Sequence, residues 1–201
     1  MMSLDAERQK AVLDAAMQLF AKVELKDISL DLLTKKSGVP AFDIIRHYQS
    51  STNILKAVLE RELELMAGAA QEPELRMPGE TIKDELRLLA GVILDQYRLR
   101  VPFLTKLLTE AMGDPKVGAL FYSTFIKQGR LLFTGFLQVR MEHGELREDV
   151  DVEAAAAIFL AALTGILMSH EMFGGKEVEP LDDERVLNEM CDSFLKGIAK
   201  K

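Results

Sequence analysis

The feature that most restricts the fold of this chain is the spacing of its apolar residues, which return every three or four positions. Val12, Leu13, Ala16, Leu19 and Phe20 show this pattern near the N-terminus. No segment alternates apolar and polar residues with the period of two that a half-buried strand requires. Tryptophan is absent, so the core must come mainly from aliphatic residues and ten methionines, most of which favour helices. The sequence therefore predicts an all-α fold.

Caps and helix breakers divide the first 70 residues into four predicted helices. Ser29 is placed to cap a helix that Gly38 ends, Pro40 suits the first turn of the next helix, and Ser50 caps another. A tight glycine-containing turn thus separates the second and third helices, as a helix-turn-helix requires, although purely structural bundles contain such corners too. The predicted helices span residues 6–22, 29–36, 40–48 and 50–69.

Two prolines and a glycine make residues 71–79 the predicted boundary between a three-helix head and a larger helical body. In the body, Pro102 breaks or kinks a helix, Asp114 with Pro115 starts another, and Asp151 caps a strongly apolar one. About nine helices are expected in total. Those of the body span residues 80–100, a shorter stretch to 112, then 115–142, 152–173 and 182–198.

The charge distribution neither excludes nor requires a nucleic-acid partner. The formal net charge is −7, but residues 1–64 hold nine lysines and arginines against ten acidic residues, so the acidity lies mostly in the body. The head is close to neutral. Binding of DNA would therefore depend on where individual charges are placed and not on a strongly basic surface.

Across residues 8–60 the apolar, capping, turn and third-helix positions fall in a single register. They are Val12-Leu13, Ala15-Ala16, Leu19-Phe20, Ser29, Gly38-Val39, Arg46-His47-Tyr48, Ser50 and Ile54-Leu55. In this order and spacing they resemble the N-terminal signature of the tetracycline-repressor (TetR) family of transcriptional regulators. A weaker resemblance continues through Gly144-Glu145-Leu146-Arg147, Asp149, Asp151 and the alanine-rich helix that contains Gly165.

The resemblance implies a helix-turn-helix DNA-binding domain over residues 1–50, with the motif at about 29–48, a connecting helix over 51–70, and a ligand-binding and dimerisation domain over 71–201. It also implies a homodimer that places two recognition helices on a palindromic double-stranded DNA operator. A small apolar effector in the body would change the spacing of the heads and release the DNA, which is the action of a repressor.

Four positions depart from the family pattern. Glu24 stands where a glycine usually follows the first helix, and Asp31 stands where basic residues are frequent. Ile45 replaces a common tyrosine and Ser51 a common lysine, both of which often contact phosphate in that family. These departures imply weaker or more salt-sensitive DNA binding, or an unusual operator.

Helical spacing assigns the faces of the third predicted helix. Ile44 and Tyr48, four residues apart, should pack inward, which leaves Phe42 and Arg46 on the opposite face. Arg46 could bind a guanine or a phosphate, or merely pair with Asp43. His47 could donate to a phosphate or be purely structural, and Lys35 and Lys36 could contact the DNA backbone or serve only solubility. The candidate DNA-contacting residues are Ser29, Lys35, Lys36, Ala41, Phe42, Asp43, Ile45, Arg46, His47 and Ser51.

The body contains two further candidate surfaces. Aromatic and methionine side chains on its middle helices are either ordinary core or the wall of an apolar ligand site: Tyr97, Phe103, Met112, Phe121, Tyr122, Phe125, Phe133 and Met141. Small residues on the apolar helix allow close approach of a partner helix, and with the last helix they form the candidate dimer interface: Ala157, Ala161, Gly165, Met168, Leu187, Met190 and Phe194.

No set of residues indicates catalysis. The three histidines do not have metal-ligand spacing, and no phosphate-binding loop or nucleophile motif is present, so we expect no enzyme activity, metal or cofactor. Cys191 is expected to be a packed thiol in a cytoplasmic protein that does not span a membrane. The main alternative is a helical ligand-binding or interaction protein with the same fold that has lost specific DNA recognition.

Overall fold

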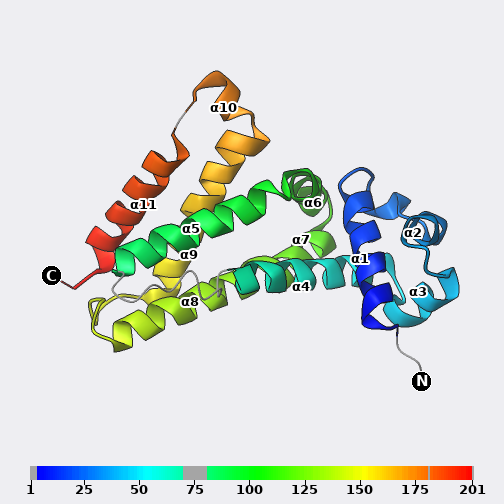
Figure 1. Ribbon diagram of the computed structural model, residues 1–201, viewed down its shortest axis with the longest axis horizontal. Helices are drawn as coiled ribbons and strands as arrows, with labels where there is room; N and C mark the ends of the chain where they lie inside the picture. Colours follow the sequence, from blue (N-terminus) through cyan, green and yellow to red (C-terminus); the bar gives the residue numbers. More distant parts are fainter. Residues whose placement is uncertain (1–3, 70–80, 181, 201) are drawn as a thin grey trace. The chain divides into compact units, whose positions relative to one another are not determined.

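The computed structural model describes residues 4–69, 81–180 and 182–200, and helices account for most of them (Figure 1). Within these ranges, extended pairing is limited to one isolated bridge between Leu146 and Ala199. The all-α prediction is confirmed. The α-helices are α1 Ala6–Phe20, α2 Leu30–Ser37, α3 Ala41–Tyr48, α4 Ser51–Ala69, α5 Ile82–Arg98, α6 Val101–Gly113, α7 Pro115–Phe121, α8 Lys127–Glu142, α9 Val152–Leu167, α10 Gly175–Val178 and α11 Asp183–Ile198.

The helices begin at the capping residues that the sequence indicates. The Ser29 and Ser50 hydroxyls each accept a hydrogen bond at 3.2 Å from the backbone amide three residues later. Asp114, Asp151 and Asp182 cap α7, α9 and α11 through their carboxylates. Each cap satisfies an amide that has no partner within the first helical turn, which is why these residue types mark helix starts.

Two π-helical segments and a short extra helix differ from the prediction. The helix expected over residues 115–142 is interrupted by η3 Tyr122–Ile126, and α9 continues into η4 Met168–Met172. The chain turns at Gly174, which adopts a φ of 70°, but α10 follows. A π turn needs no special residue type, so apolar spacing does not reveal it. The predicted boundary at residues 71–79 lies outside the described residues.

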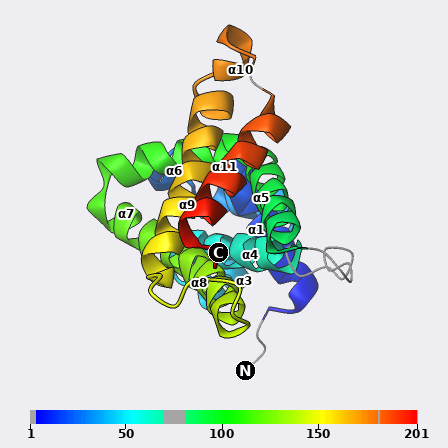
Figure 2. The ribbon, with the colours of Figure 1, turned by 90° about the vertical axis from the view of Figure 1, so that its left-hand side faces the viewer.

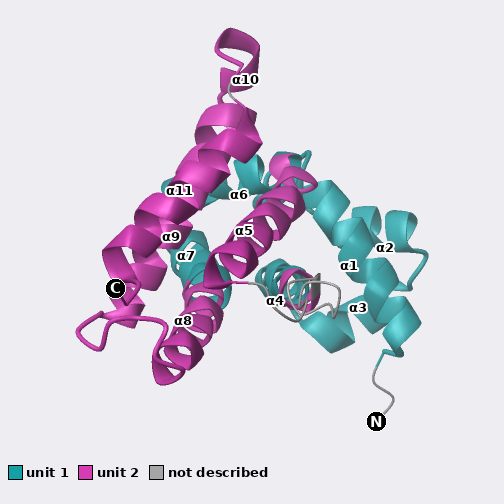
Figure 3. Ribbon diagram, turned by 60° about the vertical axis from the view of Figure 1, so that its left-hand side comes forward, with its two compact units in different colours: residues 1–63, 102–126 teal, residues 64–101, 127–201 magenta. Residues whose placement is uncertain are grey.

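The chain forms two compact units, coloured separately in Figure 3. Unit 1 comprises residues 1–63 and 102–126, and unit 2 comprises residues 64–101 and 127–201. These units do not follow the predicted functional domains, because α6 and α7 pack with the N-terminal helices. Within unit 1, the Phe20 and Phe103 rings lie 6.5 Å apart, and the Leu25 amide donates to the Glu110 carboxylate at 3.3 Å.

In unit 1, an ion pair joins α1 to α4. The Arg61 guanidinium of α4 donates to the Asp14 carboxylate of α1 at 2.7 Å, and it also contacts Glu62 at 2.9 Å. Burial acts to raise the pKa of Asp14, but the hydrogen bond from Lys10, together with the charge and hydrogen bond of Arg61, holds this pKa below its ordinary value. Both carboxylates are therefore placed beside a cation, which offsets the cost of removing them from water.

Aromatic side chains fill the core of unit 2. The fully buried Phe159 ring lies 4.8 Å from Phe133 and 4.9 Å from Phe194, centroid to centroid. Aromatic pairs at such distances add to the free energy of burying the rings. Cys191 is buried in the same core, and burial raises the pKa of its thiol to about 11, so it is the packed thiol that the sequence predicts.

An ionic cluster links the end of α5 to η4, α10 and the start of α11. Arg98 contacts Glu171 at 2.7 Å and also binds Asp183, while Lys176 lies 2.6 Å from Glu171 and 2.8 Å from Asp183. The buried His170 ring contributes a further contact to Asp183 at 3.1 Å. The hydrogen bond from Lys176 is the largest influence holding the pKa of Glu171 below its usual value, so this carboxylate stays ionised.

Candidate nucleic-acid interface

The corner between α2 and α3 has the local geometry of a helix-turn-helix. Gly38 ends α2 with a φ of 72°, a left-handed conformation that other residue types adopt at a cost. Leu33 on α2 and Val39 in the turn are both buried, so apolar packing holds the angle between the two helices. Pro40 then precedes the first turn of α3. The turn therefore positions α3 as the outer helix of the motif.

The faces of α3 are those that helical spacing predicts. Ile44 and Tyr48 are buried against the head, whereas Phe42 is 69% exposed and Ile45 48% exposed. Arg46 lies on the same exposed side. The outward face of α3 thus combines two large apolar side chains with one guanidinium.

Arg46 does not form the structural pair with Asp43 that was its alternative interpretation. The Asp43 carboxylate lies 3.6 Å from the Arg8 guanidinium of α1 instead, and among the described residues Arg46 has no ion-pair partner. The His47 ring packs edge-on against Tyr48 at 4.5 Å, and no hydrogen bond joins it to Asp43 in this part of the chain. Arg46 is therefore available to a ligand with hydrogen-bond acceptors.

The remaining candidate DNA-contacting residues lie on α2, in the first turn of α3 and at the start of α4. Lys35 and Lys36 are exposed in the last turn of α2, Ser29 caps that helix, and Ser51 starts α4. Ala41 is half-buried in the first turn of α3. These placements are compatible with the predicted contacts without testing them.

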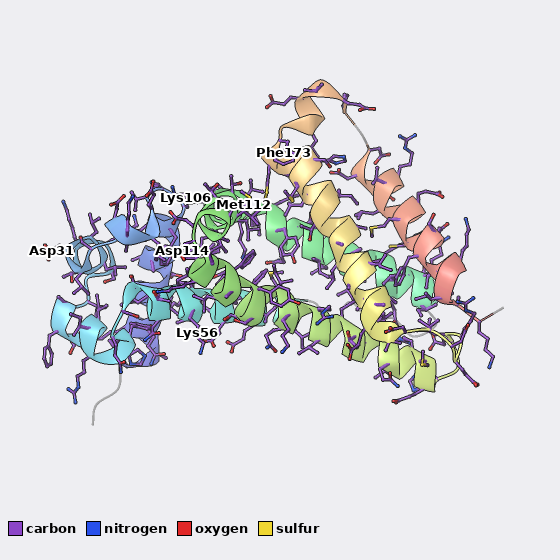
Figure 4. All side chains as sticks on the ribbon, turned by 180° about the vertical axis from the view of Figure 1, so that it is seen from behind. Asp31, Lys56, Lys106, Met112, Asp114 and Phe173 are labelled. Atoms are coloured by element: carbon purple, nitrogen blue, oxygen red, sulfur yellow. The ribbon has the colours of Figure 1, made fainter. Side chains whose placement is uncertain are left out.

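Asp31 places a negative charge on α2 of the head. It is exposed in the first turn of α2 and projects from that helix in Figure 4. A carboxylate there interacts favourably with the helix dipole but would repel a nearby phosphate. Glu24, the other acidic departure from the family pattern, precedes η1 Leu25–Asp27 with a φ of −68°, so the turn does not need glycine there.

One further residue of this surface was not found from the sequence. Gln49, between α3 and α4, is exposed and has a φ of 67°, the positive value that glycine normally supplies. Backbone strain of this kind is often found at functional sites. Glutamine carries no sequence signal for such a conformation, so inspection of the sequence could not have identified it.

The candidate effector residues are divided between the two compact units. Phe103, Phe121 and Phe125 are buried in unit 1, where only Phe103 of the eight borders a small apolar recess of about 10 Å³. Met112, labelled in Figure 4, is 81% exposed. Tyr97, Phe133 and Met141 belong to unit 2. Ligand sites for drug-sized molecules have volumes of about 300–1,000 Å³, so this recess does not provide one.

The candidate effector side chains of unit 2 lie in different environments. Phe133 stacks on Phe159 in the core cluster of unit 2. Tyr97 is half-buried, and burial raises the pKa of its phenol to about 12, so it is neutral and can act as a hydrogen-bond donor. Aromatic composition therefore selected side chains in different environments, and their role as ligand contacts stays a prediction.

The candidate dimer residues lie on or near one face of unit 2. Figure 2 shows α9 and α11 one beside the other, facing the viewer. Ala161 and Gly165 are exposed, and Ala157, Met168, Leu187, Met190 and Phe194 are half-buried. An open groove of about 350 Å³, bordered by Ile158 and Phe194, lies between these helices.

The helical stretch Val152–Met172 is apolar enough to cross a membrane, with a mean hydropathy of 1.9, and 28% of that window is buried. A helix of this composition exposes apolar surface that a second protein surface or a lipid must cover. Among the described residues, no group of three or more histidine, cysteine or acidic side chains could hold a metal ion.

Comparisons with known proteins place the chain among regulators. A family model for the C-terminal domain of AefR-like transcriptional repressors, a TetR C-terminal domain type, matches residues 102–197. The uncharacterised HTH-type transcriptional regulator YvkB of Bacillus subtilis (strain 168) is 23% identical over 192 residues, which cover 94% of this chain and 96% of YvkB.

Solved structures share the fold. The flavonoid-responsive regulator FrrA matches with a TM-score of 0.73 at 21% identity, over 98% of this chain and 100% of that one. The fatty acid degradation regulator FadR from Bacillus halodurans matches with a TM-score of 0.71 at 15% identity, over 96% of this chain and 97% of that one.

Proposed function

This chain belongs to the TetR family of transcriptional regulators, and on that premise we propose that it is a homodimeric repressor that binds a palindromic operator through α3. The observation that carries the proposal is the outward face of α3, where Arg46 has no ion-pair partner among the described residues. An exposed guanidinium on the second helix of such a motif can bind guanine in the major groove. DNA recognition is assigned to residues 1–50, coupling to 51–70, and ligand binding and dimerisation to 71–201.

Replacing Arg46 with alanine should weaken operator binding about 10- to 100-fold without changing the thermal stability of the protein. One good bidentate base contact contributes about 1–3 kcal/mol of discrimination, which corresponds to this range. Gel-shift titrations of the fragment upstream of the protein's own gene, at two salt concentrations, measure the effect. Arg147→Ala is the matched control, because Arg147 forms an exposed ion pair in unit 2.

The salt dependence distinguishes two roles for Arg46. Loss of a base contact leaves the slope of log affinity against log salt unchanged, whereas loss of a phosphate contact reduces it by about one. Unchanged affinity and unchanged sequence preference in the Arg46→Ala protein would show that α3 does not read DNA through this residue.

A homodimer explains the exposed apolar surface of α9. Ala161 and Gly165 allow a partner helix to approach closely, and the half-buried Phe194 of α11 borders a groove together with Ile158 of α9. A second copy of the chain that covers this face removes its apolar surface from water, so α9 need not enter a membrane. This arrangement also provides the two recognition helices that a palindromic site requires.

The effector is proposed to be a small apolar molecule that binds in the C-terminal part of the chain. The names of the structural relatives, a flavonoid-responsive regulator and a fatty acid degradation regulator, support this chemical class. Since the recess beside Phe103 holds only about 10 Å³, a ligand that enters there must displace side chains. It can release DNA only if it binds more tightly to the conformation that does not bind DNA.

Linkage provides the test of the effector. A flavonoid and a long-chain fatty acid are suitable probes, each titrated by calorimetry with and without operator DNA. An effector that weakens DNA binding by some factor must itself bind more weakly by the same factor when DNA is present. A probe that binds equally well in both titrations is not the effector, and failure of every apolar compound in a wider panel would contradict this class.

The absence of a basic surface on the near-neutral head favours a second candidate function, that of an interaction protein that no longer recognises specific DNA. Asp31 is exposed in the first turn of α2, and the whole chain carries a net charge of −7. In that case the upstream fragment and an unrelated duplex of equal length would bind with the same affinity at low salt. Preference for the upstream fragment excludes this alternative.

A further inference from the structure

We propose that α3 recognises thymine through its C5 methyl group, with Phe42 and Ile45 as the side chains that contact the methyls. This inference rests on the proposed DNA-binding function and adds the chemical feature of the operator that the head reads. Thymine is distinguished in the major groove by this methyl group, which makes apolar contacts with protein side chains.

The chemistry of the exposed α3 surface carries the inference. Phe42 is 69% exposed and Ile45 48% exposed, although both lie on a helix whose other face is firmly packed through Ile44 and Tyr48. Large apolar side chains exposed together in this way mark a binding surface. Neither can donate or accept a hydrogen bond, so the only base feature that they can read directly is an apolar one.

The polar side chains beside them differ in whether they have partners within the head. Asp43 interacts with Arg8, and the His47 ring packs against Tyr48. Arg46 is the one residue of α3 whose long cationic side chain is exposed and, within the described ranges, has no ion-pair partner. The surface therefore reads methyl groups at the positions of Phe42 and Ile45, and a guanine or phosphate at the adjacent position of Arg46.

The spacing of the two apolar residues suits neighbouring base pairs. A helix rises about 1.5 Å per residue, so Phe42 and Ile45, three positions apart, are offset by about 4.5 Å along α3. Base pairs in duplex DNA are separated by about 3.4 Å. Because residues three apart share a helix face, both side chains can reach methyl groups one or two base pairs apart.

Weak phosphate binding makes these contacts more important for specificity. Ser51 at the start of α4 is uncharged, and Asp31 on α2 is negative, so the head has fewer cations than the family pattern predicts. Phosphate contacts contribute the same binding free energy for every DNA sequence, so they do not discriminate between sequences. Discrimination then depends more heavily on the few side chains of α3 that touch base edges.

The test replaces thymine with deoxyuridine, which pairs with adenine in the same way and lacks only the methyl group. The full-length protein first selects its preferred duplex from random-sequence DNA, and each thymine of that duplex is then replaced singly. Loss of a methyl contact should weaken binding about fourfold, the equivalent of one buried methylene. We expect this loss at one or two positions in each half-site and no change at the others.

Phe42→Ala and Ile45→Ala link each methyl group to its side chain. Each variant should bind the thymine duplex more weakly than the unchanged protein does, but should lose nothing further when its own target thymine becomes deoxyuridine. Phe173→Ala, which removes a 73% exposed ring from unit 2, is the matched control and should show the full sensitivity to deoxyuridine. Circular dichroism confirms that all variants are folded.

Two outcomes overturn the inference, and they are distinguishable from failure of the proposed function. If the protein selects a sequence but binds its thymine and deoxyuridine duplexes equally, α3 reads other features and the DNA-binding function stands. If Phe42→Ala and Ile45→Ala each weaken binding to both duplexes by the same factor, neither residue contacts a methyl group. If no sequence is selected from the random pool, the proposed function itself is wrong and the inference fails with it.

Discussion

Replacing Ala161 with glutamate should convert the protein from a dimer to a monomer and reduce operator affinity by about 100- to 10,000-fold. Ala161 is exposed on α9 in the centre of the proposed dimer interface. Two-fold symmetry would place the new carboxylate in the interface twice, where burying an unpaired charge costs several kcal/mol. A monomer also loses the gain that comes from tethering two heads to adjacent half-sites, which accounts for the expected range.

Light scattering after size-exclusion chromatography measures the assembly, and gel shifts measure the DNA affinity. Ala119→Glu is the matched control, because it introduces the same charge at an exposed position of α7 in unit 1. Both proteins should retain their helix content by circular dichroism. A monomeric unchanged protein at micromolar concentration would disprove the dimer, and an Ala161→Glu protein that remains dimeric would place the interface elsewhere.

Replacing Phe159 with alanine should lower the free energy of unfolding by about 3–5 kcal/mol. The Phe159 ring is 1% exposed and lies between Phe133 and Phe194, so its removal leaves a cavity as well as lost apolar contacts. Urea unfolding followed by circular dichroism gives the difference. Protein concentrations must be matched, since association would contribute to the measured stability.

Phe173→Ala is the control for this measurement because the same side chain is removed from a 73% exposed position just after η4. Surface substitutions of this kind usually change stability by less than about 0.5 kcal/mol. If both variants unfold at the same urea concentration, the aromatic stack is not the core of unit 2.

Most of the local architecture could be predicted because its determinants are local. Ser29, Gly38 and Asp151 act on the turn in which they lie, so their residue types alone mark helix ends. The exposed face of α3 followed from the four-residue spacing of Ile44 and Tyr48. The π segments were not predictable, because they break the helical repeat without a characteristic residue.

Features that depend on distant parts of the chain were not visible in the sequence. The ionic cluster joins Arg98 to Glu171 and Asp183, each of which lies more than 70 positions after Arg98 in the chain. Likewise, the sequence offers Arg46 as one possible partner of its neighbour Asp43, whereas the fold brings Asp43 to Arg8. Aromatic composition selected Phe133 and Met112 alike as ligand residues, but one is buried core and the other is solvent-exposed. The DNA, ligand and dimer contacts themselves remain predictions.

The ion pair between Asp14 and Arg61 constrains how this chain can change over evolutionary time. Loss of Asp14 alone would leave a largely buried guanidinium with one fewer counter-charge, and loss of Arg61 alone would remove the cation beside both Asp14 and Glu62. Either single change is disfavoured, while a joint exchange of Asp14, Arg61 and Glu62 to complementary apolar residues keeps α1 and α4 joined. Descendant sequences should therefore alter positions 14, 61 and 62 together, even though 46 residues separate the first two along the chain.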